Sequence, residues 1–234
     1  MRAQVRALAL GLLILTAAVA GCTSTTAGSS GAVQDEASAF EPSMSGAPLV
    51  GASQGSSCAS GGPCQVGSTG PGGGIVFYVA DTAFDAPGTA CGATCMYLEA
   101  QTSDLALAPW CLGPAQAKGY SIDAPGTAIG TGYLNTQAML GTYNDPPAQI
   151  CTEGAANEAV APWGGYTDWY LPAKDELATL FDQVSVVGGF NSNTYWSSSQ
   201  SAPNYAWADT LGKMGNPAST QETFDLGVRA IRAF

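Results

Sequence analysis

Apolar and β-branched residues in this chain gather into short runs separated by glycine, proline and asparagine. Residues 75–79 and 96–100 are such runs, and their length and composition predict two β-strands. Residues 195–199, 205–211 and 228–234 have the same character and predict three more strands near the C-terminus.

Between these strands the pattern changes to a helical period. In residues 172–181 a proline opens the segment, acidic residues fill the first turn, and the apolar residues fall on one face, which predicts a helix. Residues 132–140 and 153–160 lie between proline and glycine and predict two shorter helices. Helices between two groups of strands predict a single α+β domain with a mainly antiparallel sheet.

The N-terminus carries the pattern of a bacterial lipoprotein signal peptide. Arg2 and Arg6 precede an apolar run at residues 7–20, and residues 19–22 end that run with Val-Ala-Gly-Cys. The run is shorter than the roughly 20 residues that a membrane-spanning helix needs. We therefore expect residues 1–21 to be removed and Cys22 to carry lipid that anchors the protein to a membrane of the bacterial cell envelope.

The residues after the expected cleavage site divide into two parts. Residues 22–57 are rich in Ser, Thr, Ala and Gly and hold one aromatic residue, Phe40, so they predict a flexible tether that cannot bury a core. Residues 58–234 hold all the other aromatic residues of the expected mature chain and are the predicted folded domain.

Charge and histidine content exclude several classes of function. Cleavage removes two of the 7 basic residues, so five face 18 acidic ones and the mature charge is −13. No basic residue lies between Arg6 and Lys118, which argues against nucleic-acid binding by phosphate neutralisation. The chain has no histidine, which excludes a Ser-His-Asp triad, a Cys-His pair and an H-E-x-x-H zinc site.

Six cysteines remain after Cys22, an even number in an exported protein, and they predict disulfides. Short loops favour pairing Cys58 with Cys64 and Cys91 with Cys95, which leaves Cys111 with Cys151, although six cysteines allow 15 pairings. A metal site at Cys91 and Cys95 is the alternative, and an oxidising compartment without histidine favours disulfides.

Five motifs occur in an order that resembles one bacterial family, the Lcl C-terminal domain family, named after a Legionella collagen-like adhesin. The resemblance covers residues 66–234 and implies a compact exported domain, related to C-type lectin-like folds, that mediates attachment, in the namesake also to sulfated glycosaminoglycans. Sulfated polymers favour clustered basic residues, which this chain lacks. The motifs are GPGGGIVFY at 70–78, GTGYLNT at 130–136, TDWYLPAKDEL at 167–177, YWSSS at 195–199 and VRAIRAF at 228–234.

Carboxylates and tryptophans are the candidate functional side chains. A glycosidase needs two carboxylates at a defined separation, and Asp168, Asp175 and Glu176 are the candidates, although the last two are explained as acids at a helix start. Tryptophans serve either as core or as platforms for sugar rings. The candidate ligand-binding residues are Trp163, Asp168, Trp169, Trp196 and Trp207.

Metal and serine chemistry find little support. Asn144, Asp145 and Asp209 offer oxygen ligands for calcium, but no acidic loop of the kind that calcium needs is present, so we expect neither metal nor cofactor. A serine nucleophile within residues 197–199 would need a lysine base, and no motif places Lys174 or Lys213 for that role.

The final predicted strand carries two arginines, Arg229 and Arg232, on opposite faces. At least one guanidinium therefore points into the domain, where it needs a carboxylate partner. We expect Asp168 and Asp209 to supply that partner in a structural ion pair.

Together these features predict a surface-displayed, membrane-anchored binding or adhesion module without enzymatic activity. Its expected ligand is a glycan or an extracellular matrix component. The alternative is an extracytoplasmic enzyme that acts on glycans or proteins through carboxylates.

Overall fold

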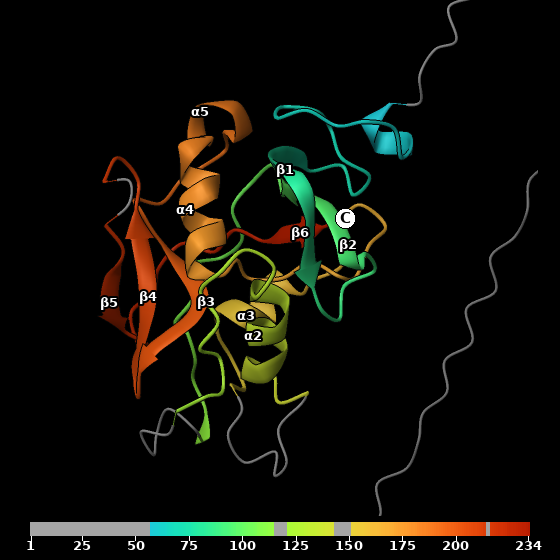
Figure 1. Ribbon diagram of the computed structural model, residues 1–234. Coiled ribbons are helices and arrows are strands. Elements are labelled where there is room, and N and C mark those ends of the chain that lie inside the picture. The colour runs from blue at the N-terminus through green and yellow to red at the C-terminus, as the bar shows by residue number, and fades with distance from the viewer. Residues whose placement is uncertain (1–56, 115–120, 143–150, 214–215) are drawn as a thin grey trace, which may run out of the picture. The chain divides into compact units, whose positions relative to one another are not determined.

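The protein is described from a computed structural model, which covers residues 57–114, 121–142, 151–213 and 216–234 (Figure 1). The expected signal peptide, the lipid-attachment residue Cys22 and all but the last residue of the expected tether lie outside the described residues.

One antiparallel sheet is built from segments at both ends of the described chain. It has the strand order β1-β2-β6, where β1 is Ile75–Ala86, β2 is Gly92–Ala100 and β6 is Ile231–Ala233. The β-branched run at the start of β1 forms the strand that the sequence predicts, and irregular register with β2 carries the strand onward to Ala86.

The second antiparallel sheet has the order β3-β4-β5, with β3 at Thr194–Ala202, β4 at Tyr205–Thr210 and β5 at Ala218–Gln221. A tight turn joins β3 to β4, and Asn204 adopts the left-handed conformation there with a φ of 65°. The sequence did not predict β5, because this edge strand is short, polar and mostly exposed and so lacks an apolar alternation.

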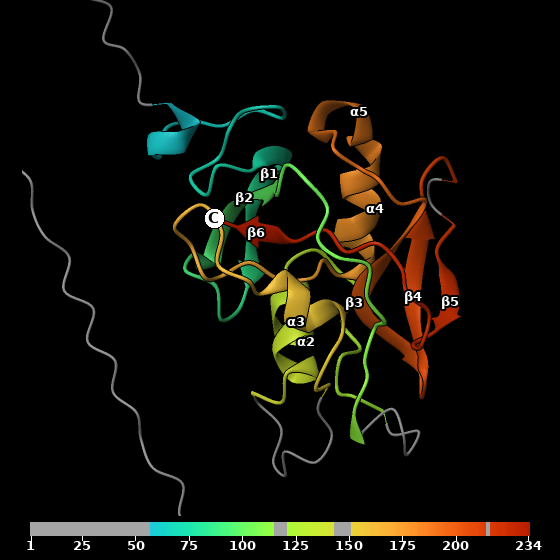
Figure 2. The same ribbon diagram turned by 180° about the vertical axis from the view of Figure 1, so that it is seen from behind.

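Helices fill the space between and below the two sheets. α4 (Lys174–Asp182) stands between them and contacts β1, β3 and β4 (Figure 1). α2 (Gly132–Met139) contacts both β1 and β3, and Figure 2 shows it beside α3 (Ala155–Ala159) from behind. Two short elements that the sequence did not predict complete the described set: the 3-10 helix η1 (Cys58–Ser60) and α5 (Val184–Val187).

Two apolar clusters form most of the core. The predicted apolar face of α4, with Leu177, Leu180 and Phe181, packs into one cluster together with β1 and β2. The other cluster lies between α2, α3 and the inner face of the second sheet, and three fully buried tryptophans, Trp110, Trp169 and Trp196, belong to it. The mixture of helices and antiparallel sheets confirms the predicted α+β fold.

Three disulfides tie the domain together: Cys58–Cys64, Cys91–Cys95 and Cys111–Cys151. This is the pairing that short loops favour. The first two close loops within local turns, whereas the third joins residues with a sequence separation of 40.

The C-terminal segment crosses from one sheet to the other. Gly227 forms a bridge with Tyr195 of β3, and Ile231 pairs with Tyr170 and with β2. Only Ile231–Ala233 is a regular strand, so the predicted strand at 228–234 is shorter than expected. This path takes both arginines of the segment through the interior.

Candidate functional site

Two neighbouring hollows form the main concavity of the described surface. One has a volume of about 360 Å³ and lies between residues 123–126 and α2. The other has about 200 Å³ and lies between residues 121–125 and the end of β3. Asp123 and Pro125 line both hollows, so we treat the two as one feature, the Asp123 groove, whose other exposed or partly exposed lining includes Ser121, Thr131, Leu134, Ser201 and Ala202.

Gln200 of β3 holds one side of this groove. Its Oε1 accepts a hydrogen bond from the Ile122 amide at 2.7 Å and another from Ser121 Oγ at 3.0 Å. Its backbone amide donates to the Ala124 carbonyl at 2.9 Å. Residues 121–124 therefore lie along β3 in a fixed position without being a strand of the sheet.

Asn135 of α2 holds the other side. Its Nδ2 donates to the Gly126 carbonyl at 2.6 Å, and its Oδ1 accepts from the Gly126 amide at 3.2 Å. A Cβ at position 126 would lie 2.7 Å from Thr131 Cβ, so this close approach requires glycine. Two buried amide side chains thus fix the floor of the groove from two different elements.

The lining combines small hydroxyl groups, an apolar strip and one carboxylate. Asp123 is exposed and carries the only charge among the residues that line the two hollows. Leu134, which is 37% exposed, and Pro125 give the groove an apolar side. Such a surface is suited to accepting hydrogen bonds from hydroxyl or amino groups while covering an apolar face of a ligand.

Sequence reasoning missed this groove. Residues 121–131 show only turn signals, Pro125, Gly126 and Gly130, and no periodic apolar pattern. Its two amide anchors, Gln200 and Asn135, come from separate elements, and nothing in the sequence indicates that they meet.

A buried carboxyl group lies directly beneath the groove. Glu222 is 1% exposed, and its Oε1 accepts a hydrogen bond from Gln200 Nε2 at 2.8 Å. Burial raises the pKa of Glu222 from 4.5 to about 7, and the hydrogen bond from Gln200 opposes that rise only in part. The Gln200 side chain therefore connects this titratable group to the segment that lines the groove.

The tryptophans proposed as sugar platforms divide between core and surface. Trp169 and Trp196 are fully buried, and their indole N–H groups donate to the carbonyls of Trp163 and Ala108, so both predictions of ligand binding are wrong for this fold. Trp163 is partly exposed and packs edge-to-face on Trp169. Trp207 is partly exposed beneath the Lys174 ammonium group, which lies 5.2 Å from its ring centroid.

Arg229 makes the buried ion pair that the sequence predicts, but with a different partner. Its Nη2 and Nε donate to Asp104 Oδ1 at 2.6 and 2.9 Å, and the remaining N–H groups donate to backbone carbonyls. Asp104 Oδ2 in turn accepts from the Tyr195 hydroxyl at 2.7 Å. Burial and this bond to Asp104 raise the pKa of Tyr195 to about 12, so the phenol stays protonated as a donor.

Arg232 pairs with Asp168, as expected, and also with a carboxylate that the sequence did not single out. Arg232 Nε donates to Asp168 Oδ1 at 2.6 Å, and Nη1 donates to Glu99 Oε1 at 3.0 Å. Glu99 also accepts from the backbone amides of Gly72 and Gly74, each at 3.0 Å. The glycine-rich motif thus wraps a buried carboxylate, and burial raises the pKa of Glu99 against these donors.

Asp209 is not the arginine partner that the sequence predicted. It lies on β4, is 2% exposed, and its Oδ1 accepts only from the neighbouring Thr210 amide at 2.7 Å. Its Oδ2 has no hydrogen-bond partner among the described residues. Burial raises the pKa of Asp209, and the charge of Asp182 at the end of α4 adds to the effect.

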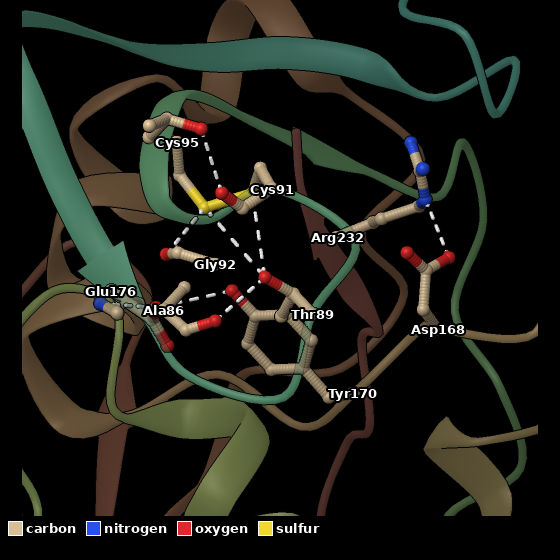
Figure 3. Close-up of a disulfide and its surroundings, with 11 residues drawn as sticks. Ala86, Thr89, Cys91, Gly92, Cys95, Asp168, Tyr170, Glu176 and Arg232 are labelled. Carbon is tan, nitrogen blue, oxygen red and sulfur yellow. Dashed lines mark hydrogen bonds and ion pairs between the residues drawn. A yellow bond between two sulfur atoms is a disulfide. The ribbon is translucent and has the colours of Figure 1, made fainter.

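Glu176 is more than an acid at a helix start. It is fully buried, and it accepts hydrogen bonds from the amides of Ala173 and Gly130 at 2.7 and 2.8 Å and from the Tyr170 hydroxyl at 3.2 Å. Burial raises the pKa of Glu176 to about 7. Figure 3 shows Tyr170 pointing at Glu176, with the Cys91–Cys95 disulfide nearby and Arg232 beside Asp168.

The serine run at residues 197–199 is fully buried and structural. Ser197 Oγ donates to the Trp207 carbonyl at 2.8 Å, and Ser199 Oγ donates to the Gly126 carbonyl and accepts from the Lys174 amide at 3.0 Å. The Lys174 ammonium group lies instead 3.6 Å from Asp175. This geometry gives Lys174 no role as a base for these serines.

The possible calcium ligands Asn144 and Asp145 lie outside the described residues. Within the part of the chain that the structure describes, no three His, Cys, Asp or Glu side chains are grouped closely enough to hold a metal ion. In the same described part, no helix has both the length and the apolar character needed to span a bilayer.

No protein-family model matches the chain, and no curated protein matches it by sequence. Among solved structures, it is similar to a fimbrial protein from Bacteroides ovatus, with a TM-score of 0.45 and 17% sequence identity. The similarity covers 69% of this chain and 44% of that protein, so this chain spans less than half of its length. A likeness this low indicates neither a family nor a function.

Proposed function

We propose that the chain is an exported, lipid-anchored binding module that recognises a glycan or a hydroxyl-rich component of the extracellular matrix. The observation that carries this proposal is the Asp123 groove, a concavity with small neutral polar groups, an apolar strip and one exposed carboxylate on a fixed floor. A rigid lining lowers the ordering cost of binding. The carboxylate disfavours sulfated ligands and favours neutral or amino-bearing ones.

The resemblance to the Lcl C-terminal domain family agrees with a role in attachment. Two of its motifs supply the supports of the groove, since Asn135 lies in residues 130–136 and Ser199 in residues 195–199. The lipoprotein pattern at residues 19–22 would place this module on the envelope, at the end of a tether.

The enzymatic alternative is weakened at the residues on which it depended. Asp168 pairs with Arg232, and Glu176 is enclosed by backbone amides and Tyr170. Each of these carboxyl groups is thus held by the interactions that support the fold. A pair of carboxylates opening into one cleft, as a glycosidase uses, is not formed by them.

The test is a glycan and matrix-protein array probed with a soluble form that lacks residues 1–22. We expect saturable binding, which Asp123→Ala and Leu134→Ala should each weaken by about tenfold, the effect of losing roughly 1.4 kcal/mol of contact. Asp225→Ala and Leu107→Ala are the matched controls, because these residues are also exposed and lie outside the groove lining. Binding that both groove variants retain in full, or no binding at all, would contradict the proposal.

The anchor is tested separately through Cys22. Replacing Cys22 with Ala should move the protein from the membrane fraction to the soluble fraction, because the acyl chains would have no attachment residue. Mass spectrometry of the parent should find a lipid-modified N-terminal Cys22. A mature chain that begins at Met1, or an unmodified Cys22 peptide, would end this part of the proposal.

A further inference from the structure

A separate hollow lies beside the same β3–β4 turn that borders the Asp123 groove. It has a volume of about 240 Å³ and is lined by Asn204, Tyr205, Gln221 and Thr223. Tyr205 begins β4 and pairs in register with Gln221 at the end of β5. We call this feature the Tyr205 hollow, and its lining residues are fixed relative to one another by the second sheet.

The lining of the Tyr205 hollow is uncharged. Tyr205 is 37% exposed, and its hydroxyl accepts a hydrogen bond from Gln221 Nε2 at 3.3 Å. Thr223 is exposed, and Asn204 Oδ1 has no hydrogen-bond partner among the described residues. One aromatic ring with two amides and a hydroxyl offers stacking to an apolar ring face, and both donors and acceptors to hydroxyl groups.

The two concavities are joined through the turn itself. Gln200, Ser201 and Ala202 line the Asp123 groove, and the next lining residues of the chain, Asn204 and Tyr205, line the Tyr205 hollow. Ala202 and Pro203 between them are exposed and small, so no bulky side chain separates the two sites. A ligand that fills both must cross this turn.

Glu222 supports the turn from below and keeps the two sites in a constant relation. Its backbone amide donates to the Asn204 carbonyl at 3.0 Å, and its side chain accepts from Gln200 Nε2 at 2.8 Å. One buried residue therefore contacts a lining residue of each concavity. The spacing of the two sites is set by the fold and does not depend on the ligand.

We propose that the ligand is a neutral oligosaccharide that crosses the β3–β4 turn, with one sugar stacked on Tyr205 and another unit in the Asp123 groove. This inference rests on the proposed function, because it names the class of glycan and the path along which it binds. Neutral sugars fit the uncharged hollow, and a chain of several units is needed to reach both sites.

Titration calorimetry with maltose-, cellulose- and chitin-derived oligosaccharides, from monosaccharide to hexasaccharide, tests the inference on the soluble form that lacks residues 1–22. For one of these series the affinity should rise with length until both sites are filled. Tyr205→Ala should weaken the longest member by about tenfold and leave the shortest member unchanged, since a single unit needs only the groove. Tyr205→Phe should keep most of the affinity because the ring remains.

Leu107→Ala serves as the control for an exposed side chain outside both concavities, and thermal melting checks that each variant is folded. Equal affinity of Tyr205→Ala and the parent for every chain length would overturn the inference while leaving the groove as a binding site. Binding on the array to charged glycans or proteins only would also overturn it. If the parent binds nothing on the array, the proposed function itself fails.

Discussion

Replacing Arg229 with Met is expected to lower the free energy of unfolding by about 3 to 5 kcal/mol. Methionine fills much of the volume but leaves the Asp104 carboxylate, whose side chain is 9% exposed, without its positive partner. It also leaves the carbonyls of Gln101, Gly188 and Gly189 without the guanidinium donors. Denaturant unfolding followed by tryptophan fluorescence measures the loss.

Two further variants separate the charge effect from packing. Lys213→Met removes an exposed charge and should change stability by less than about 0.5 kcal/mol. Combining Arg229→Met with Asp104→Asn should recover part of the loss, because the amide is neutral and still accepts from Tyr195. If Arg229→Met unfolds at the same denaturant concentration as the parent, the buried pair does not stabilise the fold.

The Glu222→Gln variant is expected to be more stable than the parent above pH 7 and equal to it near pH 4. The folded-state pKa of Glu222 is about 7 against 4.5 for the ordinary group, so the folded protein binds more protons than the unfolded chain between these values. Its stability therefore falls as the pH rises through this window, by up to about 3 kcal/mol, at 1.36 kcal/mol for each pKa unit. Glutamine removes the ionisation and keeps a carbonyl acceptor for Gln200.

Thermal melting of parent and variant across this pH range measures the difference. Glu176→Gln is the contrasting variant, since its pKa is also about 7 but the carboxyl group accepts two backbone amides. A glutamine amide turned toward either donor would lose an acceptor, so this variant should be less stable at every pH. A Glu222→Gln protein whose stability falls with pH as steeply as the parent's would show that Glu222 does not titrate in this window.

Much of the fold was predictable because its signals are local. The β-branched run that begins β1 and the proline-initiated apolar face of α4 each lie within one turn or strand of sequence. The disulfide pairing followed in the same way, since two of the three bridges close short loops and the third was left over. β5 was not predictable, because its strand conformation comes from pairing with β4 and not from its own polar residues.

The candidate site was predictable in small part only. Tryptophan is equally good as core and as a binding surface, so the sequence could not show that Trp169 and Trp196 are enclosed while Trp207 is partly exposed. The Asp123 groove and the Tyr205 hollow have no motif at all. Their residues meet because the β3–β4 turn brings residues near 121–125 and 221–223 to its two sides.

The arginines of the last segment show where the sequence ends and the tertiary structure begins. By itself the sequence determined that a guanidinium among apolar neighbours must be buried and paired, because an isolated charge is too costly to leave unpaired inside a protein. It did not determine the partner. Asp104 meets Arg229, and Glu99 joins Asp168 at Arg232, because the C-terminal segment runs between both sheets and passes residues more than a hundred positions earlier in the chain.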